Sequence, residues 1–302
     1  MEKILPLSTG HAAISVETEI SRVYGQTSHL DQLIQFYTDA LRLKVHRKEN
    51  DKVYLGTQNK ILLKLSETKP IKAVSNHSSL YHFALLYKDE FELAKALKHL
   101  DRKGYCHSPT DHGYSKTSYL TDPDGNTIEL YIRTPNRCEY IQNDQNIYVK
   151  YSDGTIGSGR DPLDMQDLYS YLNADTVIEE VLNDDVGIGH IHIYASDIHV
   201  SHQFYTKILG FANGIMYEPF HMADVSLSES KYHVIAFNQW KGQLQKANNN
   251  IQALTAFQLQ VSSNDHKQIL KRLEENNIPI KEVNHKIIFQ DPNGIQINLL
   301  KK

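Results

Sequence analysis

Two stretches of the chain are near copies of each other but differ at one carboxylate. The turn DPDG at 122–125, within YLTDPDGNTIELY, corresponds to DPNG at 291–294, within IIFQDPNGIQINLL. Glu129 in the first stretch corresponds to Asn298 in the second, and the chain also contains 16 histidines. Carboxylate and imidazole side chains transfer protons and bind metals, so the elements that position them decide what chemistry is available.

The two stretches belong to a repeat that covers most of the sequence. TSHLDQLIQFYTDALRL at 27–43 resembles DIHVSHQFYTKILGF at 197–211, at nearly the same spacing as the two DP turns. A repeat of this length indicates homologous structural units. We therefore predict two homologous domains, at about 15–134 and 186–302.

Each half divides again into two modules of one pattern. Residues 80–87 alternate as in a strand, residues 88–103 have the apolar spacing of a helix, and Gly104 is typical of a helix end. The order strand, helix, three strands recurs in the second half, with a helix expected near 199–209 and a last strand at 232–238. We predict an α+β fold of four βαβββ modules, at 18–66, 78–133, 187–240 and 252–300.

Residues 135–185 separate the two halves and are rich in Asn, Asp and Gly. A segment of this length is too long for a structureless loop. We expect an extended stretch at Ile147–Tyr151 and a helix at Pro162–Leu172, with Pro162 in its first turn.

The composition limits the classes of partner and compartment. Lys+Arg 32 against Asp+Glu 36 gives a net charge of −4, without a basic stripe, which argues against nucleic acid. No apolar run has the length of a membrane span, and the first residues lack the pattern of a signal peptide. Two cysteines are too few for a disulfide framework. The expectation is a soluble cytoplasmic protein, and the sequence leaves its oligomeric state open, a homo-oligomer included.

The four βαβββ modules, the ending DPDGNTIEL and the histidines that open two of the modules resemble the vicinal oxygen chelate superfamily. This superfamily contains glyoxalases, bleomycin resistance proteins and extradiol dioxygenases. The resemblance implies that pairs of modules form curved sheets that cup a divalent metal. Its ligands would come from the first strands of both modules and from the last strand of one or both.

The resemblance implies one metal site, made by modules two and three. The first strands contribute His82 and His190, and the last strand of module two contributes Glu129. Module one has Arg22 at the corresponding place, module four has no histidine in ALTAFQLQV, and its last strand has Asn298. Two histidines and one carboxylate suit Fe(II), and Mn(II) also accepts this set. The differing carboxylate thus indicates that one site was kept and its counterpart lost its ligands.

The surroundings of that site resemble extradiol dioxygenases of the bacterial catechol 2,3-dioxygenase type. TDHGYSKTSYLTDPDGNTIE matches their signature, with His112 and Tyr119 as catalytic residues, although Ser118 replaces the usual aliphatic residue. His233 matches the family's second-sphere acid/base, and residues 232–238 lack the fourth carboxylate ligand of glyoxalases. The resemblance implies ring cleavage of catechol or a substituted catechol by dioxygen to a semialdehyde, in aromatic hydrocarbon catabolism.

Two other functions remain open from the sequence. One is a glyoxalase-like isomerase or thiol transferase on the same fold, and the other is a non-catalytic protein that binds an aromatic compound or a drug. A single histidine in a buried strand is usually structural, so the argument rests on the three ligand positions together. The sequence does not decide which catechol is bound, or whether modules two and three pair within one chain. His192, His221 and Trp240 are further candidates for the pocket wall.

Overall fold

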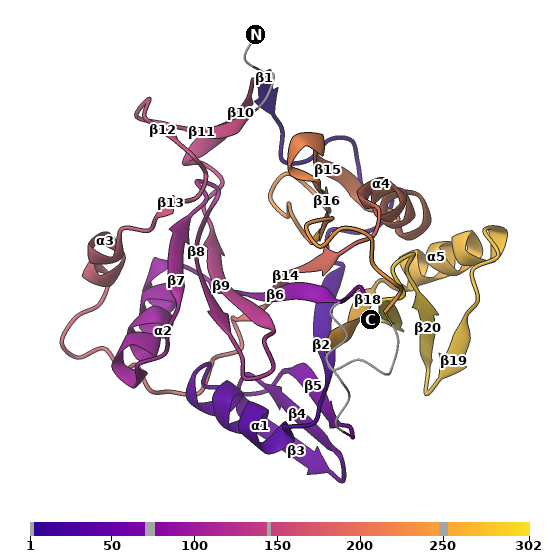
Figure 1. Ribbon diagram of the computed structural model, residues 1–302, viewed down its shortest axis with the longest axis horizontal. Coiled ribbons are helices and arrows are strands. Elements are labelled where there is room, and N and C mark those ends of the chain that lie inside the picture. Colours follow the sequence, from indigo (N-terminus) through magenta and orange to yellow (C-terminus); the bar gives the residue numbers. More distant parts are fainter. Residues whose placement is uncertain (1–2, 70–75, 144–145, 248–252) are drawn as a thin grey trace. The chain divides into compact units, whose positions relative to one another are not determined.

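A computed structural model describes residues 3–69, 76–143, 146–247 and 253–302 (Figure 1). It is a mixed α+β structure in which the order strand, helix, three strands occurs four times along the chain. The predicted fold class and the predicted module order are therefore confirmed.

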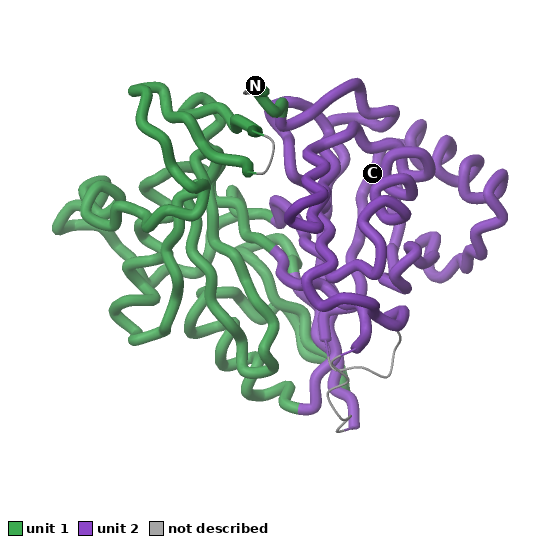
Figure 2. Tube along the Cα trace, turned by 45° about the horizontal axis from the view of Figure 1, so that its top comes forward, with its two compact units in different colours: residues 1–6, 29–62, 84–187 green, residues 7–28, 63–83, 188–302 purple. Residues whose placement is uncertain are grey.

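The chain divides into two compact units, drawn in different colours in Figure 2. Unit 1 contains Met1–Pro6, His29–Leu62 and Ala84–Gly187, and unit 2 contains Leu7–Ser28, Leu63–Phe83 and Ile188–Lys302. Three strands, β5, β6 and β14, have residues in both units. The domain boundaries inferred from the repeat stay a prediction.

The first two modules have the expected elements. Module one consists of β2 (Glu19–Thr27), α1 (Leu30–Asp39), β3 (Lys44–Glu49), β4 (Lys52–Gly56) and β5 (Ile61–Glu67). Module two consists of β6 (Leu80–Leu86), α2 (Glu90–Lys103), β7 (Ser108–Asp111), β8 (Ser115–Thr121) and β9 (Thr127–Arg133). The Asp89 side chain caps α2 by accepting from the Glu92 amide, and Gly104 ends it in the left-handed conformation, as predicted.

The last two modules repeat this order. Module three consists of β14 (Gly187–Tyr194), α4 (Ile198–Gln203) with a π-helical turn at Phe204–Leu209, β15 (Ala212–Tyr217), β16 (Met222–Ser226) and β17 (Ile235–Asn238). Module four consists of β18 (Leu254–Val261), α5 (Ser263–Glu275), β19 (Lys281–Val283), β20 (Lys286–Gln290) and β21 (Gln296–Lys301). The predicted helix at 199–209 is thus a short α-helix followed by a wider turn.

In modules one, three and four the first strand pairs in parallel with the last. Side chains alternate between the two faces of such a strand, so one face packs on the helix and the other can carry polar groups. In β14, Ile191 and Ile193 are fully buried on one face, and His190 and His192 lie on the other. This alternation places the histidines away from the apolar core.

A buried tyrosine–aspartate pair joins the modules within each half. The Tyr37 hydroxyl donates to Asp122 Oδ2 at 2.8 Å, and the Tyr205 hydroxyl donates to Asp291 Oδ2 at 3.1 Å. Each aspartate is the first residue of one of the two repeated turns, DPDG at 122–125 and DPNG at 291–294. Burial raises the pKa of Asp291 to about 6 and the pKa of Tyr205 well above its ordinary value.

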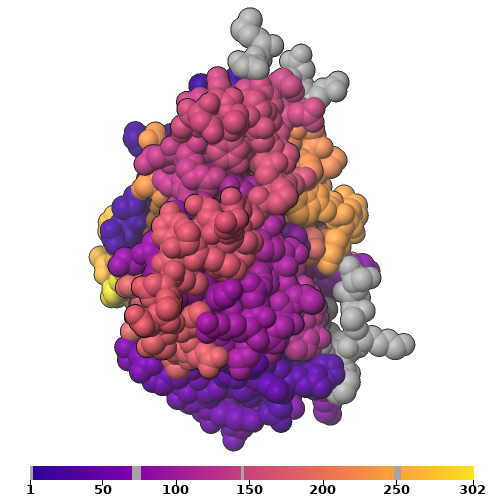
Figure 3. Space-filling model, turned by 90° about the vertical axis from the view of Figure 1, so that its left-hand side faces the viewer, coloured from indigo at the N-terminus to yellow at the C-terminus, as the bar shows by residue number. Residues whose placement is uncertain are grey.

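The segment between the halves has structure of its own within unit 1. Strand β10 (Cys138–Gln142) pairs with β1 (Lys3–Leu5) and β11 (Ile147–Tyr151), and β11 pairs with β12 (Ile156–Gly157). The predicted extended stretch at 147–151 is confirmed. Helix α3 (Met165–Ser170) packs on α2, and Figure 3 shows this part of the chain on the surface beside the α2 residues.

The predicted start of the linker helix is wrong. Pro162 lies in the short strand β13 (Asp161–Pro162), which pairs with β7, and α3 begins only at Met165. The Asp164 side chain caps this helix by accepting from the Asp167 amide, which fixes the later start. None of the helices in the described part of the chain is long and apolar enough to cross a membrane.

Candidate metal centre

Two buried histidines from β6 and β14 face each other in unit 2. His82 Nε2 and His190 Nε2 lie 3.0 Å apart, and each residue is 3% exposed. The backbone amide of Tyr194 donates to the Ser79 carbonyl oxygen at 3.0 Å, which joins the end of β14 to the residue before β6. The first strands of modules two and three therefore lie together within one chain.

The separation of the two nitrogens fits a shared metal ion. Two imidazole nitrogens that bind one ion at about 2.1 Å and at right angles lie about 3.0 Å apart. Two neutral imidazoles at this distance can also share one proton in a hydrogen bond, with one Nε2 as donor. The distance between the two nitrogens is therefore compatible with a bound metal ion and also with a direct hydrogen bond.

The carboxylate of Glu129 is buried and oriented by its own module. Glu129 is 3% exposed in β9, and the Thr117 hydroxyl on β8 donates to Glu129 Oε1 at 2.7 Å. Strand β9 also pairs with β6, the strand that carries His82. The Thr117 hydroxyl therefore fixes the orientation of the Glu129 carboxylate.

Among the residues that the structure describes, one group could hold a metal ion. It consists of His82, Glu129 and His190, all buried, with one ligand atom of each within 4.8 Å of the others. Two neutral nitrogens and one anionic oxygen are ligands that first-row divalent metals accept. The donor set therefore fits a metal, as the sequence comparison implied.

A third histidine lies beside this pair and is held by a buried aspartate. The His233 ring is 4.8 Å from the His190 ring, centre to centre, and His233 Nδ1 lies 2.7 Å from Asp224 Oδ2. Asp224 Oδ1 accepts from the Ile215 amide, so the carboxylate is fixed by the backbone. A Cβ atom on Gly214 would collide with this carboxylate, so glycine is needed there. Since the carboxylate only accepts, His233 Nδ1 carries the proton that is donated to Asp224.

The expected position of His233 within a strand is wrong. Strand β17 begins at Ile235, and His233 precedes it with a φ of 51°, in the left-handed region. Histidine is one of the few residue types other than glycine that adopt this conformation with some frequency. The turn directs the ring toward Asp224, which no motif or spacing in the sequence had indicated.

The other two predicted catalytic residues form a pair in unit 1. The Tyr119 hydroxyl lies 3.0 Å from His112 Nε2, and His112 Nδ1 lies 2.5 Å from the Gly159 carbonyl oxygen. A carbonyl only accepts, so Nδ1 carries the proton, and Nε2 accepts from the tyrosine when the ring is neutral. Tyr119 is the cross-strand neighbour of Glu129, so Tyr119 and Glu129 lie on one face of the β8–β9 pair.

Aromatic side chains surround the histidine pair within unit 2. The Tyr81 ring lies 4.8 Å from the His82 ring, 5.3 Å from the His192 ring and 5.7 Å from the Trp240 ring. His192 Nε2 accepts from the side-chain amide of Asn238 at 2.9 Å. Trp240 is 44% exposed and His192 is 3% exposed, so these rings run from the surface to the buried histidines. Sequence reasoning named His192 and Trp240 as candidates but missed Tyr81.

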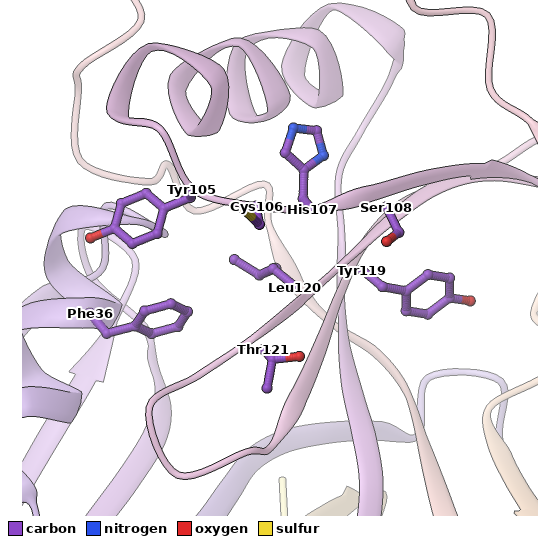
Figure 4. A pocket seen from close by; sticks show the side chains of 8 residues that line it. All are labelled: Phe36, Tyr105, Cys106, His107, Ser108, Tyr119, Leu120 and Thr121. Atoms are coloured by element: carbon purple, nitrogen blue, oxygen red, sulfur yellow. The ribbon is translucent and has the colours of Figure 1, made fainter.

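A separate cavity of about 340 Å³ lies in unit 1 (Figure 4). Its lining includes Phe36, Tyr105, Cys106 and His107. Figure 4 shows the Tyr119 ring pointing away from the Phe36 and Tyr105 rings. Tyr119 also lines this cavity, together with its neighbours Leu120 and Thr121 on β8, so the cavity borders the strand that carries one member of the Tyr119–His112 pair.

Comparison with known proteins agrees with this arrangement. The profile of the Glyoxalase/Bleomycin resistance protein/Dioxygenase superfamily matches residues 20–130. A protein named catechol-2,3-dioxygenase from Bacillus subtilis (strain 168) is 31% identical over 234 residues, which are 76% of this chain and 78% of that protein. The chain belongs to the glyoxalase/bleomycin resistance protein/dioxygenase superfamily. The family predicted from the sequence is confirmed.

Solved structures of this superfamily share the fold. A putative dioxygenase from Bacillus subtilis subsp. subtilis str. 168 has a TM-score of 0.63 at 10% identity, over 97% of this chain and 86% of that chain. Glyoxalase I from Zea mays has a TM-score of 0.55 at 16% identity, over 94% of this chain and 92% of that chain. At these identities the likeness concerns the fold alone, and members with different activities are represented.

Proposed function

We propose that this protein is an extradiol dioxygenase that cleaves the ring of catechol or a substituted catechol with dioxygen. The metal would be Fe(II), with Mn(II) as the alternative, held by His82, Glu129 and His190. The observation that carries the proposal is the pair of buried Nε2 atoms 3.0 Å apart, with the Asp224-bound His233 next to them. The 31% identity to a protein named catechol-2,3-dioxygenase supports the same reaction class.

A facial set of three protein ligands leaves other coordination positions open. When bound, the metal would supply Lewis-acid attraction that lowers the pKa of a catechol hydroxyl, together with redox chemistry toward dioxygen. The buried positions of all three ligands exclude bulk water from their surroundings. The Thr117 hydroxyl would keep the Glu129 carboxylate in one orientation.

His233 would act as the acid/base group of the reaction. Its Nδ1–H donates to the Asp224 carboxylate, which fixes the ring and makes Nε2 the nitrogen that could exchange a proton. From Nε2 the residue could donate a proton to an oxygen atom during ring opening. General acid–base catalysis of this kind contributes about 10²–10⁴-fold in rate.

Tyr119 and His112 would act together on a substrate hydroxyl. The Tyr119 hydroxyl can donate to a substrate oxygen once it turns from His112 Nε2, and His112 Nε2 can then accept a proton. Gly159 O keeps His112 in the tautomer with a proton on Nδ1. The pair therefore offers the substrate one donor, the Tyr119 hydroxyl, and one acceptor, His112 Nε2.

Oxygen consumption tests the proposal. Protein loaded with Fe(II) without air is mixed with aerated buffer and catechol, and dioxygen and a yellow ring-opened product are measured together. We expect one dioxygen consumed per product formed. The proposal fails if the iron-loaded protein consumes no dioxygen with catechol or any substituted catechol. Isomerisation of a hemithioacetal by the same preparation would then favour a glyoxalase-like enzyme.

A further inference from the structure

The face of modules one and four that corresponds to the metal centre carries cations in place of ligands. Strands β5, β2, β18, β21 and β20 are neighbours in unit 2. At the places that hold His190 and Glu129 in the other pair of modules, these strands have Arg22 and Asn298. This second face is therefore polar and positively charged, and it has neither the histidine nor the carboxylate of the metal centre.

The strand registers place the polar residues of this face side by side. Arg22 on β2 is opposite Gln258 on β18, and Gln258 is opposite Asn298 on β21. Tyr24, two residues after Arg22, is opposite Lys64 on β5. Paired residues share a face of a sheet, as do residues two apart along a strand. The other face of the same strands carries side chains with no exposed surface, namely Val23, Leu63, Phe257, Ile297 and Leu299.

Hydrogen bonds and charge bring Lys286 into this group. Lys286 Nζ donates to Gln258 Oε1 at 2.9 Å, and the Tyr24 hydroxyl donates to the same oxygen at 2.9 Å. Lys64 Nζ lies 5.7 Å from the centre of the Tyr24 ring. Gln258 is 4% exposed, so the amide oxygen that accepts both hydrogen bonds is buried beneath the longer side chains.

Positive charge predominates around Lys286 on this face. The pKa of Lys286 is lowered, first by burial and then by the positive charges of Arg22 and Lys64. The carboxylate that the register places on this face is Glu19, which is opposite Gln260 on β18 and lies 3.4 Å from Lys302 Nζ. Arg22, Lys64 and Lys286 are half-buried, so solvent reaches them while their mutual repulsion is incompletely screened.

We propose that this face, composed of Arg22, Tyr24, Lys64, Gln258 and Lys286, is a binding site for a small oxyanion, a phosphate or a carboxylate. A guanidinium can bind two oxygens of such a group at once, and two ammonium groups add point charges. The site is separate from the metal centre, and the proposal does not depend on ring cleavage.

Binding of inorganic phosphate to the full-length protein tests this site. Equilibrium dialysis with labelled phosphate is run at constant ionic strength in chloride, with benzoate in a second arm to compare a carboxylate. We expect saturable binding of one anion per chain and a higher melting temperature in its presence. Lys286→Gln and Arg22→Gln should each weaken binding about tenfold or more, since each removes a charge-assisted hydrogen bond.

Lys267→Gln is the matched control, because Lys267 is an exposed lysine of unit 2 on helix α5 and not on one of these strands. It should bind phosphate as the wild type does, and catechol-dependent oxygen uptake should be unchanged in all three variants. Stronger binding of benzoate than of phosphate would identify a carboxylate as the ligand. The proposal is overturned if neither anion binds saturably to the wild type, or if Arg22→Gln and Lys286→Gln bind as tightly as Lys267→Gln.

Discussion

The carboxylate of Asp224 should govern turnover although it is not a predicted metal ligand. The Asp224 side chain is 4% exposed and lies 2.7 Å from His233 Nδ1. Asp224→Asn keeps the size of the side chain and an oxygen that can accept from the Ile215 amide, but removes the negative charge from the His233 bond. The substitution therefore changes the orientation of the His233 ring and the charge of its hydrogen-bond partner.

The expected magnitude follows from that hydrogen bond. A hydrogen bond to a charged group contributes about 1.5–3 kcal/mol, and about 1.4 kcal/mol corresponds to a factor of ten. If the whole free energy of this hydrogen bond stabilises the transition state, kcat of Asp224→Asn should fall about 10–100-fold. Iron content should stay at the wild-type level, because His82, Glu129 and His190 are unchanged.

The assay is initial oxygen uptake with saturating catechol, on iron-loaded protein of measured metal content. Asp265→Asn is the control, because Asp265 is also a buried aspartate of unit 2 and is bound by Ser262 and Ser15 far along the chain from Asp224. In a His233→Ala background, Asp224→Asn should cause no further loss. An unchanged kcat in the single variant, or an equal loss in both backgrounds, would refute the proposed coupling.

Three further outcomes are expected. The His82→Ala and His190→Ala proteins should each lack stoichiometric iron or manganese by elemental analysis. Full metal retention in both variants would contradict their assignment as ligands. Thr117→Val, which removes the hydroxyl that donates to Glu129, should weaken metal affinity about 10–100-fold in a chelator competition, and an unchanged affinity would count against that role. Burial raises the pKa of Asp291 to about 6 from its ordinary 3.8, so the folded state holds this proton more tightly than the unfolded state. The group should lower the free energy of unfolding by about 3 kcal/mol as the pH rises from about 4 to above 6. Urea titrations of wild type and Asp291→Asn at pH 4 and pH 7 should show this pH dependence only in the wild type, and the same dependence in both would contradict it.

The module order was predictable because its signals are local. Alternation in β6, apolar spacing in α2 and Gly104 at its end each occupy a few consecutive residues. The repeat then extended the pattern to the other modules. The linker helix was misplaced because Pro162 suits a first helical turn, but the strand pairing of β13 and the Asp164 cap determine the start instead.

The candidate site was predictable only as far as the repeat and the resemblance reached. They selected His82, Glu129 and His190 from many histidines and carboxylates, and these residues form the one metal-capable group of the described chain. Asp224 was missed because it meets His233 through the β16–β17 hairpin and the left-handed turn before β17. Contacts of this kind depend on strand register and backbone conformation, which residue types alone do not specify.

The origin of the oxygen atoms in the product tests the proposed function most directly. Iron-loaded protein is given catechol under ¹⁸O₂, the product is reduced at once with borohydride so that its aldehyde oxygen does not exchange with water, and its mass is measured. An extradiol dioxygenase should place one ¹⁸O in the new carboxylate and one in the alcohol derived from the aldehyde. A ring-opened product without ¹⁸O in its carboxylate, or no ring opening at all, would contradict the proposed function.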